Sequence, residues 1–97
     1  MKDLADLRAA DFQACVGDDV DLRTAEGVVR VTLRSVEVRG RGWDRPEAFS
    51  VLFVGPADAP LDQGVFGLGH PRLPGVELLL VPVGRDQAGM LYEAVFN

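Results

Sequence analysis

The sequence is poor in the side chains that most often carry catalysis. It has one cysteine, Cys15, and one histidine, His70, and its two serines, Ser35 and Ser50, lie in stretches that we expect to be strands. One cysteine excludes an internal disulfide bond, and one cysteine with one histidine cannot fill a structural zinc site. Because no Gly-x-Ser-x-Gly motif is present either, we expect no catalytic residue, no bound metal and no cofactor.

The few groups that resemble chemical motifs are better explained as structure. Cys15 and His70 lie far apart in the sequence and nothing in the pattern brings them together, so we interpret Cys15 as a small buried hydrophobe. Asp18, Asp19 and Asp21 form the densest group of carboxylates, but they lack the longer regular spacing and the distal glutamate of a calcium loop. We interpret them as side chains on the exposed face of a strand.

Three glycines, Gly64, Gly67 and Gly69, are spaced as in a phosphate-binding loop. Such a loop must open a helix, and no helical pattern follows these residues. We therefore interpret them as glycines at a bend or a close approach within a strand.

Positive charge and long apolar runs are also scarce. The net charge is −5, and the basic residues are arginines except for Lys2, with no clustered basic face for nucleic acid. The longest apolar run, residues 76–83, is interrupted by Glu77 and Pro82 and is too short to cross a membrane. The N-terminal stretch lacks the apolar core of a signal peptide. We expect a soluble cytoplasmic protein with neither nucleic acid nor a membrane as its partner.

What the sequence does contain is a β pattern over most of its 97 residues, which predict a single domain, 1–97. A helix is expected within residues 3–16, ending at Gly17, and apolar and polar side chains alternate from there onward. We predict a mainly β fold, a small antiparallel barrel or half-barrel of about six strands with one short N-terminal helix docked on it. The strands are expected near residues 19–24, 28–38, 48–54, 64–69, 75–83 and 90–96.

One irregularity in this alternation bears on the shape of the sheet. Val36 and Val38 are apolar but out of phase with Leu33, and an uncorrected slip would turn every later side chain to the wrong face. We therefore predict a β-bulge near Ser35, which bends the strand and favours closure into a barrel.

Several short motifs resemble those of an uncharacterised family of small bacterial domains of unknown function. They are FSVLFVGP at 49–56, LDQG at 61–64, the pair His70-Pro71, VPVG at 81–84 and the closing YEAVFN at 92–97. The resemblance implies no assigned activity, and it implies an association with phage-tail-like assemblies, because some members are encoded beside phage-tail-like proteins. This sequence departs from the family pattern at Arg8, where a hydroxyl would cap the helix, and at Gly67 and Gly69.

Two features suggest contact with another protein. The loop with Arg39, Arg41, Trp43 and Arg45 has the composition of an interaction hot spot, unless its tryptophan folds back over the end of the barrel. The run at 76–83 is too apolar for one buried face, so either the helix or another subunit covers its second face.

We therefore expect a non-catalytic protein-interaction or accessory module, with an unidentified protein or a second copy of the chain as its partner. The alternative is a small-molecule-binding or small enzyme domain with a pocket at the mouth of the barrel. The absence of a nucleophile with its base, or of a metal set, favours the first hypothesis.

Overall fold

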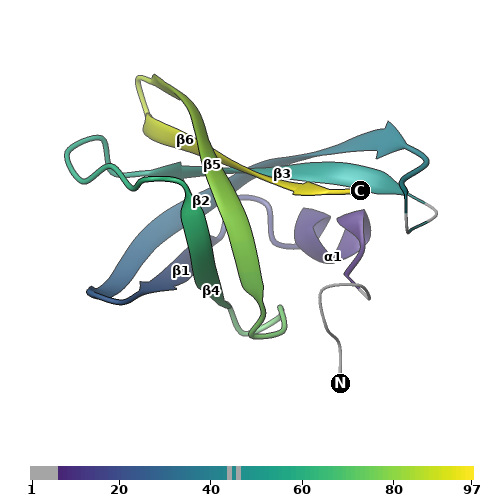
Figure 1. The fold of residues 1–97 in the computed structure, drawn as a ribbon, viewed down its shortest axis with the longest axis horizontal. Helices are drawn as coiled ribbons and strands as arrows, with labels where there is room; N and C mark the ends of the chain where they lie inside the picture. The colour runs from purple at the N-terminus through teal and green to yellow at the C-terminus, as the bar shows by residue number, and fades with distance from the viewer. Residues whose placement is uncertain (1–6, 44, 46) are drawn as a thin grey trace.

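The structure is a computed structural model, and it describes residues 7–43, 45 and 47–97. These residues form one short helix and six strands (Figure 1). In chain order the elements are α1 (Ala9–Gln13), β1 (Asp19–Thr24), β2 (Gly27–Gly40), β3 (Ala48–Gly55), β4 (Gly64–Gly69), β5 (Glu77–Asp86) and β6 (Gly89–Phe96). The predicted fold class, a small antiparallel β structure with one short helix, is confirmed.

The six strands form a closed ring in the order β1-β2-β3-β6-β5-β4, with every neighbouring pair antiparallel. Most neighbours are consecutive in the chain, as expected for hairpins. The exceptions are β6, which lies between β3 and β5, and the pairing of β1 with β4, which closes the ring. Tight turns join β1 to β2 and β5 to β6, whereas the longer loops 41–47 and 70–76 join β2 to β3 and β4 to β5.

The predicted bulge in the second strand is confirmed. The pairing of β2 with β3 moves from Leu33↔Phe53 to Ser35↔Leu52, so that Arg34 is the extra residue. Two further irregularities, between Val38 and Gly40 and between Pro82 and Gly84, were not predicted. Bulges bend their strands and increase the local twist, and β2 follows such a curved path along the ring in Figure 1.

The barrel is filled by the inward side chains of its strands. Val20, Leu22, Leu33, Val51 and Phe53 are all fully buried, in agreement with the period of two in the sequence. Tyr92 is also buried, and its hydroxyl accepts a hydrogen bond from the Leu61 backbone N–H at 2.8 Å. The phenol therefore fills the core without leaving a polar atom unpaired.

Helix α1 closes one end of the barrel. The expected helix began at residue 3, and residues 3–6 lie outside the described part of the chain; the helix itself runs from Ala9 to Gln13. Phe12 packs against Phe49 and Phe96, which stack on each other across β3 and β6 with ring centroids 4.5 Å apart. The helix was predicted to end at Gly17 but ends at Gln13, and Gly17 ends the turn that follows it, with a φ of +93° and an N–H that donates to the Leu33 carbonyl.

The helix does not cover the outer face of β5. It packs against β2 and β3, and Leu79 near the start of β5 remains 53% exposed. Of the two ways in which the apolar run at 76–83 could be covered, cover by the helix is therefore wrong.

Candidate functional site

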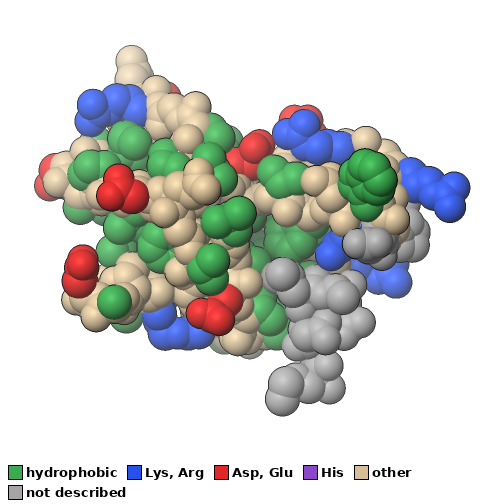
Figure 2. Space-filling model, in the orientation of Figure 1, with side chains coloured by type: hydrophobic (Ala, Val, Ile, Leu, Met, Phe, Trp, Pro, Cys, Tyr) green, Lys and Arg blue, Asp and Glu red, His purple; other side chains and the backbone are tan. Residues whose placement is uncertain are grey.

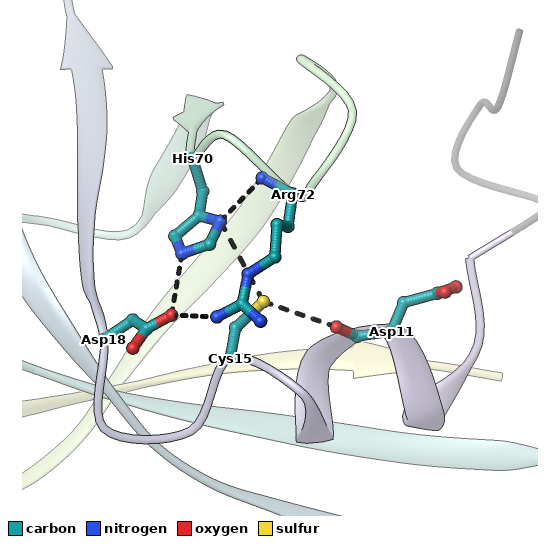
Figure 3. A network of polar contacts seen from close by, with 5 residues as sticks. All are labelled: Asp11, Cys15, Asp18, His70 and Arg72. Atoms are coloured by element: carbon teal, nitrogen blue, oxygen red, sulfur yellow. Dashed lines mark hydrogen bonds and ion pairs between the residues drawn. The ribbon is translucent and has the colours of Figure 1, made fainter.

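Cys15 and His70 meet in the folded chain, contrary to the expectation that nothing brings them together. Cys15 lies in the turn after α1, Asp18 directly precedes β1, and His70 and Arg72 belong to the loop between β4 and β5 (Figure 3). The Sγ atom of Cys15 is 3.9 Å from Nδ1 of His70, and Nε2 of His70 is 3.0 Å from a carboxylate oxygen of Asp18. Closure of the ring positions these groups, since β1 pairs with β4.

The contacts around His70 define its proton positions. The Arg72 backbone N–H donates to Nδ1 at 3.0 Å, so this nitrogen carries the lone pair in the neutral ring. The hydrogen therefore lies on Nε2 and is donated to Asp18. The resulting order of thiol, imidazole and carboxylate is the order found in cysteine-based nucleophilic sites.

The thiol at the head of this arrangement is nevertheless not prepared for reaction. Cys15 is 0% exposed, and its burial raises the pKa of the thiol, an effect that the positive charge of Arg72 only partly opposes. Reactive cysteines have a lowered pKa and a partly exposed sulfur atom, because the thiolate is the nucleophile. The side chain of His70 is only 4% exposed as well. This geometry does not support nucleophilic catalysis.

The same cluster offers three metal-ligating groups. One ligand atom each from Cys15, Asp18 and His70 lies within 4.8 Å of the others. The two ring nitrogens of His70, however, face different partners, so a metal ion bound to either nitrogen would displace an existing hydrogen bond. The Arg72 guanidinium also lies 2.7 Å from the Asp18 carboxylate and already supplies the positive charge that balances this carboxylate. The donor set therefore does not fit a metal ion in this arrangement.

What the cluster does is hold the β4–β5 loop against the turn that follows α1. Hydrogen bonds from His70 and then from Arg72 keep the pKa of Asp18 below its ordinary value of 3.8. Among the described residues, no buried side-chain nitrogen or oxygen lacks a hydrogen-bond partner. A paired polar network around the buried imidazole of His70 favours one arrangement of the segments that it joins.

The residues expected to bind a partner separate into two kinds. Arg39 donates to Ser50 Oγ at 3.1 Å and to Glu93 at 3.3 Å. Arg45 donates to the Leu7 carbonyl at 2.7 Å. It also lies over the rings of Phe49 and Phe96, about 5.5 Å from each centroid. These two arginines brace the loop between β2 and β3.

Trp43 and Arg41 behave differently. Trp43 is 91% exposed, so the alternative in which it folds back over the barrel is wrong. Arg41 is exposed beside it. The loop therefore presents a tryptophan and an arginine to solvent from a braced base.

A second unusual surface is the outer face of β4, β5 and β6. Val65 lies opposite Leu79 in the register of β4 and β5, and Val95 of β6 is exposed as well. Apolar side chains are visible over these strands in the left half of Figure 2. A groove of about 150 Å³ runs between β5 and β6, and the described residues that line it are Leu78, Leu79, Val81, Glu93, Ala94, Val95 and Phe96. We call it the β5–β6 groove.

The apolar run at 76–83 is the sequence feature that pointed to this surface, although Val65 and Val95 were not singled out. The position of Val95 could have been found from the alternation alone, because it lies between the buried Ala94 and Phe96 in β6. In β4 the three residues after Val65 are all buried, so alternation gives no such signal there. An exposed apolar surface of this kind often marks an interaction site.

Two further cavities lie outside the barrel core. The larger, of about 430 Å³, lies between the turn after α1 and the β5–β6 hairpin, with Arg30, Thr32 and Arg34 on its wall and Val54 and Pro56 beside them. The other, of about 300 Å³, lies at the end of the barrel between the β1–β2 turn and the β3–β4 loop. The arginines of the first are already paired, Arg30 with Asp21 and Arg34 with Asp86.

Of three comparisons with known proteins, one gives a match. The family model described as "Domain of unknown function (DUF6916)" matches residues 7–96. Neither the curated proteins nor the solved structures contain a significant match. Within residues 7–43, 45 and 47–97, no helix is long and apolar enough to cross a membrane.

Proposed function

Since the chain belongs to the DUF6916 family, a domain family without an assigned function, we propose a function from its geometry: a non-catalytic protein-interaction module. The observation that carries this proposal is Trp43, which is 91% exposed in the loop between β2 and β3. Tryptophan is among the residues that contribute most to protein interfaces when they are buried there. A large aromatic side chain left in solvent is therefore best explained by a partner that covers it.

The bracing of the loop supports this role. Binding costs free energy whenever flexible side chains and loops must be ordered at the interface. Arg39 and Arg45 hold the base of the loop through their contacts with Ser50 and with the Leu7 carbonyl. Trp43 is therefore presented from a base that is ordered in advance, which lowers the cost of association.

The cluster around Cys15 supports the non-catalytic part of the proposal. A thiol that is enclosed and has a raised pKa lacks both access to substrate and the thiolate form. Its neighbours His70 and Asp18 are explained by their role in joining two segments. The association with a phage-tail-like assembly remains a prediction from the sequence resemblance.

The test is affinity capture from native cells with the wild-type chain and with Trp43→Ala, followed by mass spectrometry. Because Trp43 makes little contact within the chain, the variant should fold normally and lose the partners of the wild type. Val28→Ala is the matched control, since Val28 is an exposed side chain on β2. A Trp43→Ala variant that retains every captured protein would overturn the proposal.

A second candidate function is the binding of a small molecule. The cavity of about 430 Å³ favours it, because its volume falls in the range of ligand pockets. This cavity lies on the outer side of β2 and β3, whereas the pocket expected from the sequence lies at the mouth of the barrel. Native mass spectrometry of the purified chain tests this function, and a retained small molecule lost in Thr32→Trp would support it.

A further inference from the structure

We propose that the partner is a second copy of this chain, with Trp43 of one copy docked in the β5–β6 groove of the other. This inference rests on the proposed function and names its partner. Both halves of the contact are present on every chain: an exposed aromatic side chain on one surface and an apolar groove on another.

The size and lining of the groove fit an aromatic ring. Its volume is about 150 Å³, and an apolar cavity of that size is large enough to hold a benzene molecule. Leu79, Val81 and Val95 supply aliphatic walls. The carboxylate of Glu93 already accepts a hydrogen bond from Arg39 of its own chain. Docking of an indole would therefore bury no unpaired charge.

The charges around the two surfaces are complementary. Arg41, which is exposed and lies two residues before Trp43, carries a positive charge in a chain whose net charge is −5. Arg39 and Glu93 are already paired with each other, so the acidic group that the groove offers to a partner is the exposed Glu77, which begins the strand that forms one wall. Arg41 of one copy would be attracted to Glu77 of the other, and complementary charge of this kind selects a partner and a register.

The positions of the two surfaces favour a closed pair. The loop lies beside the C-terminus, since a Cβ built on Gly42 would come within 2.8 Å of Asn97. The groove is lined near the same terminus by Val95 and Phe96. Trp43 and the β5–β6 groove therefore lie at the same end of the molecule. In a two-fold symmetric pair, Trp43 of each copy can dock in the groove of the other at the same time. Closed pairs of this type are the commonest oligomers. We therefore expect a dimer.

The experiment uses Trp43 itself as the probe, because it is the only tryptophan in the sequence. Light scattering after gel filtration gives the mass, and tryptophan fluorescence gives the environment of the indole, both from low to high micromolar concentration. The wild type should gain mass with concentration while its emission moves to shorter wavelength. Leu79→Ser should remain a monomer whose emission stays at the solvent-exposed wavelength, although its Trp43 is intact.

Two variants complete the design. Trp43→Ala should remain a monomer, and Val28→Ser should associate as the wild type does, since Val28 is exposed on β2 and does not line the groove. Leu79 is half exposed, so its replacement should leave the fold intact, which circular dichroism checks. A wild-type chain that stays monomeric with unshifted emission at high micromolar concentration overturns the inference, as does association that survives in Leu79→Ser.

The outcomes separate this inference from the proposed function. If the wild type is monomeric but Trp43→Ala loses the proteins captured by the wild type, Trp43 binds a different protein. In that case only the identification of the partner as a second copy of this chain is wrong. If Trp43→Ala changes neither the mass nor the captured proteins, both proposals fall.

Discussion

At the scale of single residues, His70 is the side chain of the polar cluster whose removal should destabilise the protein most. It accepts from the Arg72 backbone N–H, donates to Asp18 and contacts the thiol of Cys15, while almost none of its side chain is exposed. His70→Ala removes the acceptor of the Arg72 backbone N–H and one of the two donors to Asp18, and it empties the enclosed space that the imidazole fills. We therefore expect the free energy of unfolding to fall by about 1–3 kcal/mol. Urea unfolding followed by circular dichroism measures it.

Arg72→Ala is the control for that measurement. The Arg72 side chain is 59% exposed and its backbone N–H survives the substitution, so only a solvent-screened ion pair with Asp18 is lost. Such pairs contribute about 0–1 kcal/mol. An Arg72→Ala variant that is destabilised as much as His70→Ala would show that the buried imidazole has no special role.

The residue scale is also where sequence analysis succeeds and fails most clearly. The loop around Trp43 follows from its arginine, glycine and proline content, whereas the exposure of Trp43 was one of two alternatives that this composition left open. The meeting of Cys15 and His70 depends on the pairing of β1 with β4, and neither residue carries a local pattern of that pairing. Contacts that form only when the ring closes cannot be predicted from the residues next to them in the sequence.

At the scale of elements, the β5–β6 hairpin depends on Gly89. Its φ is +143°, and a Cβ atom there would lie only 2.1 Å from the carbonyl oxygen of Gly55 on β3. We expect Gly89→Ala to destabilise the protein more than Gly27→Ala. Gly27 also has a positive φ, of +134°, but open space around it, so its substitution should cost only the backbone strain, about 1–3 kcal/mol. Denaturant unfolding of the two variants compares them, and equal losses would contradict the steric argument.

The same hairpin is tied to β2 by the ion pair of Arg34 with Asp86. The hydrogen bond from Arg34, with smaller contributions from the backbone of Ala88, lowers the pKa of Asp86 from its ordinary value of 3.8. The folded state thus holds this proton less tightly than the unfolded chain, so the stabilisation is present above about pH 4 and is lost as the pH falls through the folded-state pKa.

Asp86→Asn removes this contribution at every pH. We expect the variant to be less stable than the wild type at neutral pH, and the two free energies of unfolding to converge on acidification below pH 4. Thermal unfolding at a series of pH values measures the difference. A gap that is constant from neutral pH to pH 2 would contradict the assignment.

For elements as a whole, the period of two predicts which side chains face the core. The phase slip after Leu33 predicts a bulge near Ser35, and the structure places its extra residue at Arg34. The ends of strands are harder to predict. β5 continues through Gly84, Arg85 and Asp86, which read as a polar turn. Backbone pairing with β6 extends the ladder there without any apolar side chain. Strand length therefore depends on the partner strand, which the local pattern does not contain.

At the scale of the whole molecule, the ring is closed by its shortest strand pairing, the seam between β1 and β4. β1 and β4 share three residue pairs, Asp21↔Gly69, Leu22↔Leu68 and Arg23↔Gly67, whereas β3 and β6 share seven. Local opening should begin where the ladder is shortest. In native-state hydrogen exchange we expect the amides of β4 that face β1 to exchange faster than the amides between β3 and β6. Equal protection of the two seams would show that the ring opens only by global unfolding.

The sequence predicts the class of the overall shape, a small antiparallel barrel, but not the order of its strands. Short turns predict antiparallel neighbours, and the bulge predicts curvature, so a closed or half-closed barrel follows from the sequence. The insertion of β6 between β3 and β5, and the closing contact of β1 with β4, are long-range choices. They are decided by which pairings bury Phe53, Tyr92 and Leu68 together, and that depends on the whole set of strands.

The closing seam also governs how the chain behaves among its own copies at high concentration. A ring has no free strand edge, and free edges are the templates on which chains add to one another. If the three pairs between β1 and β4 part, each molecule gains two unpaired edges beside the aliphatic side chains of Val65 and Leu79. Protection from strand exchange and fibre growth in this protein therefore depends on one short line of hydrogen bonds.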